Sequence, residues 1–339
     1  MDRFLRACRR EPVDVTPVWF MRQAGRYQPE YRKIREKYTL MEICKIPEVA
    51  AEVTILPVKQ LGVDAAILFS DIMVPLHQIG IAVDLKPNVG PVLDKPLRSA
   101  EDVKALRPIV PEEDVPFVLE AIKILRRELD VPLIGFSGGP FTLASYLIEG
   151  RPTRKFTEVK RMMFGAPDVW REMMERLTSI VIDYLLAQVQ AGAQALQLFD
   201  SWVGCLSPQD YEEYVLPYSK RILTALEGTG VPRIHFGVGT GEMLPLLKEA
   251  GADVVGVDWL VPLDAAWERI GYDTAVQGNL EPNLLLGDEA LILERTRDVM
   301  RRANGRPGHI FNLGHGVMPQ AKVSTLQRIV EAVHEYSVD

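Results

Sequence analysis

Residues 191–201, AGAQALQLFDS, carry the pattern that decides the fold: a helix end, a glycine, a short apolar run and an acidic residue. The same order recurs in residues 61–71, LGVDAAILFSD, and in residues 250–259, AGADVVGVDW. A glycine directly after a helical segment suits a left-handed C-cap. Repeated helix–glycine–strand junctions indicate repeated right-handed crossovers between parallel strands.

Eight short apolar runs extend this pattern along the chain, and most are continuous, as in parallel strands buried on both faces. They lie at residues 17–21, 65–69, 131–136, 195–199, 233–238, 254–257, 275–277 and 309–313. Helical periodicity is found between them, at residues 47–61, 157–191, 210–226, 241–250, 288–303 and 319–336. Eight strands alternating with helices predict an α/β protein: one (β/α)8 TIM barrel over residues 1–339, with a deep cleft at the C-terminal face of the strands.

The main competing fold is a doubly wound open sheet, but no GxGxxG follows the first strand. Residues 81–116 are rich in proline and poorly periodic, which predicts an insertion after the second strand. The length of 339 residues suits one barrel, because this fold needs about 250 residues and tolerates insertions.

The composition limits the classes of function. A hydrophobic fraction of 47% and a charged fraction of 25% are ordinary for a soluble globule, and they exclude disorder, collagen and coiled coil. The net charge of −7 gives no general attraction for nucleic acid or anionic lipid. No apolar run reaches the roughly 18 residues of a membrane span, and the N-terminus lacks an apolar signal core. We therefore expect a cytoplasmic protein that binds neither nucleic acid nor membrane.

The charge is unevenly distributed. Residues 1–37 contain ten Lys and Arg against five Asp and Glu, a net charge of +5, so the remaining chain carries −12. The low total therefore conceals a basic N-terminal segment, which can hold a small anion locally.

Metal-ligand spacing is absent from the sequence. The three cysteines, Cys8, Cys44 and Cys205, lie far apart without CxxC and are interpreted as reduced thiols. None of the five histidines belongs to HExxH or to a His/Cys cluster. There is no GxSxG and no GxxxxGK[ST], and no isolated lysine at a strand end suggests a Schiff base. We expect no metal site.

Polar and small residues follow the predicted strands, where a barrel carries its chemistry. They are Arg22, Gln23 and Arg26; Ser70 and Asp71; Ser137, Gly138 and Gly139; Asp200 and Ser201; Gly239 to Gly241; Asp258; Asn279; and His315.

Two arginines in residues 21–32, MRQAGRYQPEYR, follow the first strand directly. Arg22 and Arg26 would share one face of a helix, but Gly25 favours a loop or tight turn with close backbone approach. The planar, two-pronged guanidinium group recognises carboxylate or phosphate, so two of them at a cavity mouth suggest a polyanionic substrate. A pair of surface ion pairs is the alternative.

Three further features each allow two interpretations. Asp71 can accept substrate N–H groups and stabilise positive charge, or it can cap a turn or helix. The glycine-rich turn in GFSGGPFTLASY, residues 135–146, can bind an anion on backbone N–H groups, or it can allow tight strand–helix packing. His315, in NLGHG, can donate to a substrate carboxylate or carbonyl, or it can be structural.

The motifs in residues 17–32 and 135–150 resemble the two signatures of the uroporphyrinogen decarboxylase family. FSDI, FDSWVGCLSP and NLGHGV occur in the family's order and spacing, and the resemblance covers nearly the whole chain. It implies a TIM barrel, usually a homodimer, acting in the cytoplasm on the heme pathway. The implied reaction removes carbon dioxide from the four acetate side chains of a tetrapyrrole, uroporphyrinogen III, to give coproporphyrinogen III without metal or organic cofactor.

The resemblance also implies roles for individual residues. Asp71, Arg22 and Tyr146 would be catalytic, with Asp71 stabilising the transition state next to the pyrrole N–H groups. Arg22 is also a candidate proton donor, although its high pKa makes it a poor general acid. Tyr146 and Ser201 would donate hydrogen bonds near Asp71, while His315 would contact a carboxylate. The substrate-binding set is Arg22, Gln23, Ala24, Gly25, Arg26, Asp71, Tyr146, Ser201 and His315.

Two other functions are weighed against this one. Related cobalamin-linked methyltransferases bind zinc through a His-x-Cys element, but here residues 235–237 read HFG and no cysteine follows Cys205. A non-catalytic tetrapyrrole-binding barrel would keep the arginines but would not need Asp71.

Overall fold

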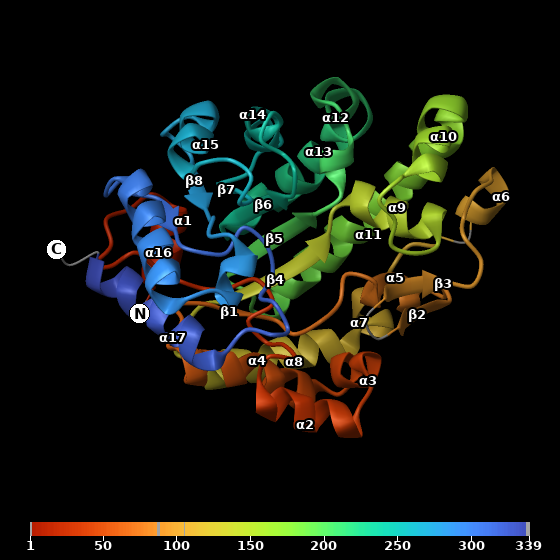
Figure 1. Ribbon diagram of the computed structural model, residues 1–339. Coiled ribbons are helices and arrows are strands. Elements are labelled where there is room, and N and C mark those ends of the chain that lie inside the picture. Colours follow the sequence, from red (N-terminus) through yellow and green to blue (C-terminus); the bar gives the residue numbers. More distant parts are fainter. Residues whose placement is uncertain (1, 87–88, 105, 337–339) are drawn as a thin grey trace.

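The centre of the structure, a computed structural model that describes residues 2–86, 89–104 and 106–336, is a curled parallel sheet (Figure 1). Its strands are hydrogen-bonded in the order β1-β4-β5-β6-β7-β8-β9, so each crossover returns the chain next to the previous strand. Their bounds are β1 Ala66–Ile67, β4 Leu133–Gly138, β5 Ala195–Asp200, β6 Arg233–Gly237, β7 Val254–Gly256, β8 Ala275–Gln277 and β9 His309–Ile310.

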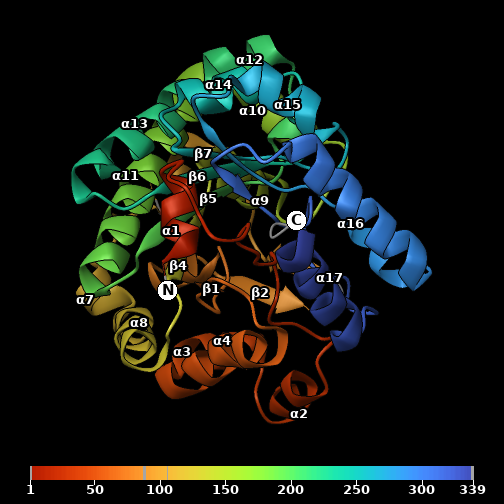
Figure 2. The same ribbon diagram turned by 90° about the vertical axis from the view of Figure 1, so that its left-hand side faces the viewer.

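Helices form a ring outside the strands, which confirms the α/β barrel (Figure 2). The ring contains α4 Pro47–Leu61, α8 Pro116–Glu128, α11 Pro167–Ala191, α13 Leu216–Leu226, α14 Leu244–Glu249, α15 Leu263–Ile270, α16 Glu289–Ala303 and α17 Val323–Tyr336. Helix α1, Arg3–Cys8, packs against β8 and β9 and lies across one end of the ring (Figures 1 and 2). The side chains between strands and helices form one continuous apolar core.

Other elements form the connections. They are α2 Pro29–Lys37, α3 Leu40–Lys45, α5 Val74–Gln78, α9 Pro140–Glu149, α10 Thr157–Gly165, α12 Pro208–Tyr214 and the 3-10 turns η1 Val203–Cys205, η2 Glu227–Thr229 and η3 Pro282–Leu286.

The prediction of eight full strands is wrong at residues 17–21, which form a single parallel bridge, Val18 to Phe311, instead of a strand. The segment still occupies the eighth position of the barrel. On one side the Phe311 N–H donates to the Pro17 carbonyl, and on the other the Asp64 N–H donates to the Val18 carbonyl. Regular pairing stops because the Val18 N–H donates to the Asp64 side chain at 2.8 Å and the chain turns at Arg22, whose φ is 59°.

Two predicted helices are each divided in the structure. Residues 157–191 form α10 and α11, because Pro167 has no N–H and its ring would clash with the preceding helical turn. Residues 210–226 divide in the same way at Val215, just before Pro217. The helix predicted at 47–61 is confirmed at both ends, and its C-cap, Gly62, has the left-handed φ of 70°.

Residues 81–116 form the expected insertion, although residues 87, 88 and 105 lie outside the described part of the chain. The insertion contains an antiparallel hairpin, β2 Val83–Lys86 and β3 Gly90–Leu93, and two short helices, α6 Ala100–Val103 and α7 Pro111–Asp114. The Leu93 N–H donates to the Gly150 carbonyl and the Leu97 N–H to the Leu147 carbonyl, both at 2.8 Å. The insertion is thereby attached to helix α9, on the opposite side of the molecule from α1 and α17 (Figure 1).

A buried chain of polar side chains crosses the inside of the barrel. The Trp19 indole N–H donates to Gln277 at 2.9 Å, and the Gln277 amide donates to Gln197 at 3.1 Å. The Gln197 amide in turn lies 3.6 Å from the Met21 sulfur. Because unsatisfied amides are costly in a dry interior, this chain fixes residues 19–21 against β5 and β8.

The Asp64 carboxylate joins three separate parts of the chain. It accepts hydrogen bonds from Arg3 of α1, from the Val18 backbone and from His334 of α17, at 2.8 to 2.9 Å. One largely buried anion therefore ties both terminal helices to the segment that closes the barrel.

We predict that Asp64→Asn lowers the free energy of unfolding by about 1–3 kcal/mol, because the amide cannot replace every charge-assisted bond. Urea unfolding followed by circular dichroism measures this loss. Asp130→Asn, at an exposed position after α8, is the control and should leave stability unchanged. Equal stability of the two variants would contradict the role given to Asp64.

Candidate active site

The predicted site residues gather at the C-terminal end of the strands, with Arg22 as the common neighbour. The Arg22 guanidinium acts electrostatically on Asp71, Tyr146 and His315. Among the described residues it has no hydrogen-bonded or ion-paired partner of its own. The fold therefore brings together, around one exposed cation, groups that come from separate parts of the chain.

The Arg22 backbone is held by the segment after β9. The Met21 N–H donates to the Asn312 side chain at 3.0 Å, and the Val317 N–H donates to the Met21 carbonyl at 2.8 Å. Gly316 lies directly against the Arg22 side chain, since a Cβ at this glycine would stand 2.7 Å from Arg22 Cγ. Arg22 itself has a left-handed φ of 59°, which is strained for a residue other than glycine.

Asp71 follows β1 and is half-buried. Its Oδ1 accepts the Met73 N–H at 2.8 Å, so the carboxylate caps the turn before α5. This agrees with the interpretation of Asp71 as a turn-capping residue. Burial raises the pKa of the Asp71 carboxyl, while the Met73 N–H and the positive charge of Arg22 act against that shift. The turn bond uses one oxygen, so capping does not prevent the second oxygen from accepting a ligand N–H.

His315 is held in one tautomer. Its Nδ1 accepts the Gly316 N–H at 2.6 Å, which leaves the proton on Nε2 available for donation. Burial, followed by the nearby positive charge of Arg22, lowers the pKa of His315 to about 4. The ring is therefore neutral at pH 7, and it lies between Phe236 and Trp259, with ring centroids 6.4 and 6.3 Å away.

Tyr146 lies in helix α9 and stacks at a tilt on Trp202, with ring centroids 4.5 Å apart. Burial raises the pKa of the Tyr146 hydroxyl to about 12, and the Asp71 charge adds to the shift. The hydroxyl therefore stays protonated at neutral pH and can act as a hydrogen-bond donor towards an anion.

The remaining predicted residues differ in what their side chains can do. Ser201 is half-buried in the turn after β5. Gln23 is fully buried: it donates to the Ala65 carbonyl at 3.1 Å and accepts the Phe20 N–H at 3.1 Å. Ala24 is partly buried, and the Gly25 N–H donates to Gln28 at 3.0 Å within the turn that the glycine predicted.

Arg26 is exposed, and its charge acts on the Tyr31 hydroxyl of α2. The two arginines therefore do not share a helical face, because residues 21–28 form turns before α2 begins at Pro29. Arg22 acts on Asp71, Tyr146 and His315, and a role for Arg26 in substrate binding stays a prediction.

The N-terminus of α9 binds a carboxylate of the protein itself, that of Asp200. Asp200, the last residue of β5, accepts the Thr142 N–H and the Thr142 hydroxyl on Oδ1, at 3.2 and 2.8 Å. A Cβ at Gly139 would stand 2.5 Å from Asp200 Cγ, so this glycine makes room for the carboxylate. The glycine-rich turn therefore serves tight strand–helix packing, and an internal carboxylate occupies this helix N-terminus.

Sequence reasoning missed several residues that support the site, namely Thr142, Trp202, Phe236, Trp259, Asn312 and Gly316. Trp202, Asn312 and Gly316 stand within or next to the motifs FDSW and NLGHG, and this proximity was the available signal. Phe236 and Trp259 could not be assigned to the site from the sequence, because ordinary core strands also contain aromatic residues.

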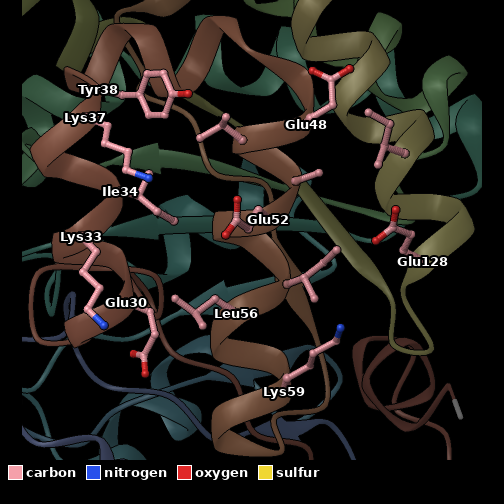
Figure 3. A pocket seen from close by; sticks show the side chains of 14 residues that line it. Glu30, Lys33, Ile34, Lys37, Tyr38, Glu48, Glu52, Leu56, Lys59 and Glu128 are labelled. Carbon is pink, nitrogen blue, oxygen red and sulfur yellow. The ribbon is translucent and has the colours of Figure 1, made fainter.

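A groove of about 700 Å³ lies outside the barrel, between α2, α4 and α8 (Figure 3). Its charged rim includes Lys33, Lys37, Glu48 and Glu52, and it contains none of the predicted site residues. The deep cleft expected at the C-terminal face stays a prediction.

All three cysteines are free thiols. Within residues 2–86, 89–104 and 106–336, no three or more His, Cys, Asp or Glu side chains come together as a metal site would require. In the same ranges no helix has the length and apolar character needed to traverse a lipid bilayer.

The fold and this cluster define an α/β-barrel protein with a cation, a buried carboxylate, a phenol and a neutral imidazole at the C-terminal end of its strands. The family model described as Uroporphyrinogen decarboxylase (URO-D) matches residues 1–336. A uroporphyrinogen decarboxylase of Carboxydothermus hydrogenoformans is 55% identical, covering 99% of this chain and 97% of the relative. That of Thermobifida fusca is 58% identical, covering 98% and 92%. The chain belongs to the uroporphyrinogen decarboxylase family.

Solved structures support the fold alone. A methyltransferase from Methanosarcina mazei has a TM-score of 0.77 at 21% identity and covers 98% of both chains. A B12-independent methionine synthase from Shewanella sp. W3-18-1 has a TM-score of 0.59 at 12% identity, covering 85% of this chain and 86% of the other. At such identities the shared barrel carries no argument for a shared reaction.

We predict that Gly316→Ala displaces the Arg22 side chain without unfolding the protein, because the Gly316 backbone φ is not in the left-handed region and the arginine is flexible. A displaced cation should lower turnover by about tenfold to a hundredfold. Gly165→Ala, where the new methyl group meets open space, is the control. Steady-state kinetics and a melting curve for both variants decide, and normal turnover in Gly316→Ala would exclude this contact as a determinant of activity.

Proposed function

We propose that this chain removes carbon dioxide from the four acetate side chains of uroporphyrinogen III, giving coproporphyrinogen III in porphyrin synthesis. The observation that carries the proposal is the meeting of Asp71, Tyr146 and His315 around Arg22, in a chain whose family membership extends from end to end. The curated relatives that carry the decarboxylase name are aligned over nearly their full lengths.

Decarboxylation needs an electron sink, because the bond from the acetate methylene to the carboxylate breaks and leaves its electron pair behind. Protonation of a pyrrole ring carbon makes the ring cationic, and that cation accepts the pair as carbon dioxide leaves. The methylene carbon then takes up a proton and the ring carbon releases one. The net result is that a methyl group replaces the acetate and one proton is consumed at each of the four positions.

Asp71 supplies fixed negative charge where the ring becomes positive. Its second carboxylate oxygen is available to pyrrole N–H groups, while the Met73 N–H holds the first oxygen in place. A preorganised charge of this kind stabilises the transition state more than the ground state, because the ring carries its full positive charge only during the reaction. The positive charge of Arg22 opposes the effect of burial and favours the ionised carboxylate.

The other groups bind the anionic side chains. Arg22 would pair with an acetate or propionate carboxylate and so orient the macrocycle. Tyr146 and Ser201 would donate hydrogen bonds near the reacting side chain, and His315 would donate through Nε2 to a carboxylate. Gln23 would act by fixing the turn, since both ends of its amide already bind the backbone.

We also propose a homodimer in the cytoplasm and a single domain over residues 1–339, of which residues 1 and 337–339 lie outside the described chain. The large apolar core that extends from α1 to α17 supports the domain assignment. Light scattering on the purified full chain tests the oligomeric state, and a monomer at micromolar concentration would exclude the dimer.

The proposal predicts that Asp71→Asn lowers turnover by about 10²–10³ while the affinity for coproporphyrinogen changes much less. The amide keeps the shape of the side chain but removes the charge that stabilises the ring cation. Anaerobic assays of uroporphyrinogen conversion, with product binding measured separately, check both quantities. Asp94→Asn, at an exposed position of the insertion, is the control.

Three outcomes would reject parts of this proposal. Near-normal turnover of Asp71→Asn would refute the charge-stabilising role. Wild-type protein that is folded and binds the tetrapyrrole but forms no coproporphyrinogen would favour the non-catalytic binding barrel. One equivalent of tightly bound zinc in the purified protein would favour the methyltransferase alternative.

A further inference from the structure

Asp200 is a buried carboxylate to which the proposed reaction gives no role. It is fully buried at the end of β5. Residues alternate across a strand, and Gln197 and Phe199 contact other side chains inside the barrel, so Asp200 faces the helical layer. There its Oδ1 accepts both donors of Thr142 at the start of α9, as a capping residue supplied from a distant part of the chain would.

The contact continues from Thr142 to the aromatic residues of the site. The Thr142 hydroxyl accepts the Trp202 N–H at 3.3 Å, so one side chain links Asp200 to the turn that carries Ser201 and Trp202. Trp202 then packs on Tyr146 at 4.5 Å and on Phe156 at 5.0 Å between ring centroids. Thr142 and Tyr146 stand four residues apart on α9 and so lie on the same face of that helix.

The second oxygen of Asp200 is enclosed, and the carboxylate is held through the first oxygen alone. Oδ2 lies 3.9 Å from Nε2 of His235, and both groups are fully enclosed. Among the described residues, neither Oδ2 nor the ring nitrogens of His235 have a hydrogen-bond partner. A buried carboxylate must be compensated, and here the compensation comes from the α9 N-terminus and the Thr142 hydroxyl, which both donate to Oδ1.

We propose that Asp200 is a positioning residue for the decarboxylation: through Thr142 it fixes Trp202 against Tyr146 and fixes the turn of Ser201. This inference rests on the proposed function, because it assigns Asp200 to the reaction that Tyr146 and Ser201 serve. Asp200 touches neither substrate nor reacting atoms, and its effect passes through hydrogen bonds and ring packing. The role of Asp200 also explains why a glycine stands at position 139, since any larger residue there would displace the carboxylate.

Thr142 offers a matched pair of substitutions that tests the link. Thr142→Val keeps the volume but removes the hydroxyl that Asp200 and the Trp202 N–H both use, whereas Thr142→Ser keeps the hydroxyl and loses only a methyl group. We expect Thr142→Val to lower kcat by about tenfold or more with a smaller change in KM, because the catalytic groups are misplaced although the carboxylate binders remain. Thr142→Ser should stay within about twofold of the wild type in kcat.

A second variant displaces Asp200 without altering Thr142, Trp202 or Tyr146. Gly139→Ala fits the backbone, whose φ is −66°, but its methyl group would collide with the Asp200 carboxylate. We expect the same fall in kcat as in Thr142→Val, with Gly165→Ala as the control. Wild-type kcat in both Thr142→Val and Gly139→Ala would overturn the proposal, and so would a loss in Thr142→Ser as large as that in Thr142→Val.

A readout that does not depend on activity separates this inference from the proposed function. Amide hydrogen exchange at Thr142 and Trp202 should accelerate in Thr142→Val and Gly139→Ala but not in Thr142→Ser or Gly165→Ala. Unchanged exchange in the first two variants overturns the positioning contact whatever the activity. A wild-type protein that shows the expected exchange pattern but does not decarboxylate overturns the proposed function and, with it, the assignment of Asp200 to catalysis.

Discussion

The closure of the barrel between its first and last segments is the constraint on which the site depends. Residues 17–21 are too irregular for a strand, so they are held by a bridge to Phe311, by the Asp64 carboxylate and by the buried Trp19–Gln277–Gln197 chain. Along this seam, the line of contact between residues 17–22 and 309–317, Met21 is hydrogen-bonded to Asn312 and Val317. It therefore places Arg22 beside the loop of His315, almost 300 residues away along the chain, and any loosening of the seam would separate them.

Placing one cation at this seam sets the chemistry around it. Asp71, Tyr146 and His315 are all partly withdrawn from water, which disfavours their charged forms. Arg22 favours an ionised Asp71, and it adds to the effect of burial that keeps His315 neutral, so one charge acts in opposite directions on two neighbours. The net charge of −7 says nothing about this arrangement, because a small polycarboxylate would experience the local field of Arg22 at the strand ends and not the average over the surface.

The glycines of the two longest motifs show how one signal can have two physical origins. From the sequence, the turn at residues 137–139 could be an anion site or a packing device. In the structure the turn allows close packing. The group packed against it is an anion, since the carboxylate of Asp200 occupies the space that a Cβ of Gly139 would take. Gly316 similarly leaves space for the Arg22 side chain. Both glycines are needed because of partners more than 50 residues away, which explains why local turn rules could not assign them.

The sequence by itself determined the class of fold and the order of strands and helices, because strand periodicity and helix caps are local features. The motifs around Arg22, Asp71 and His315 are local too, and they supplied the candidate site residues. The helix breaks at Pro167 and near Pro217 also follow from local sequence, because proline interrupts a helix. A prediction from helical periodicity alone missed both breaks. Only the tertiary structure decided that residues 17–21 make a bridge, that Arg22 and not Arg26 meets Asp71, and that Asp200 caps α9. Each of these outcomes depends on contacts between residues distant in the chain. The energies of such contacts cannot be read from a local sequence pattern.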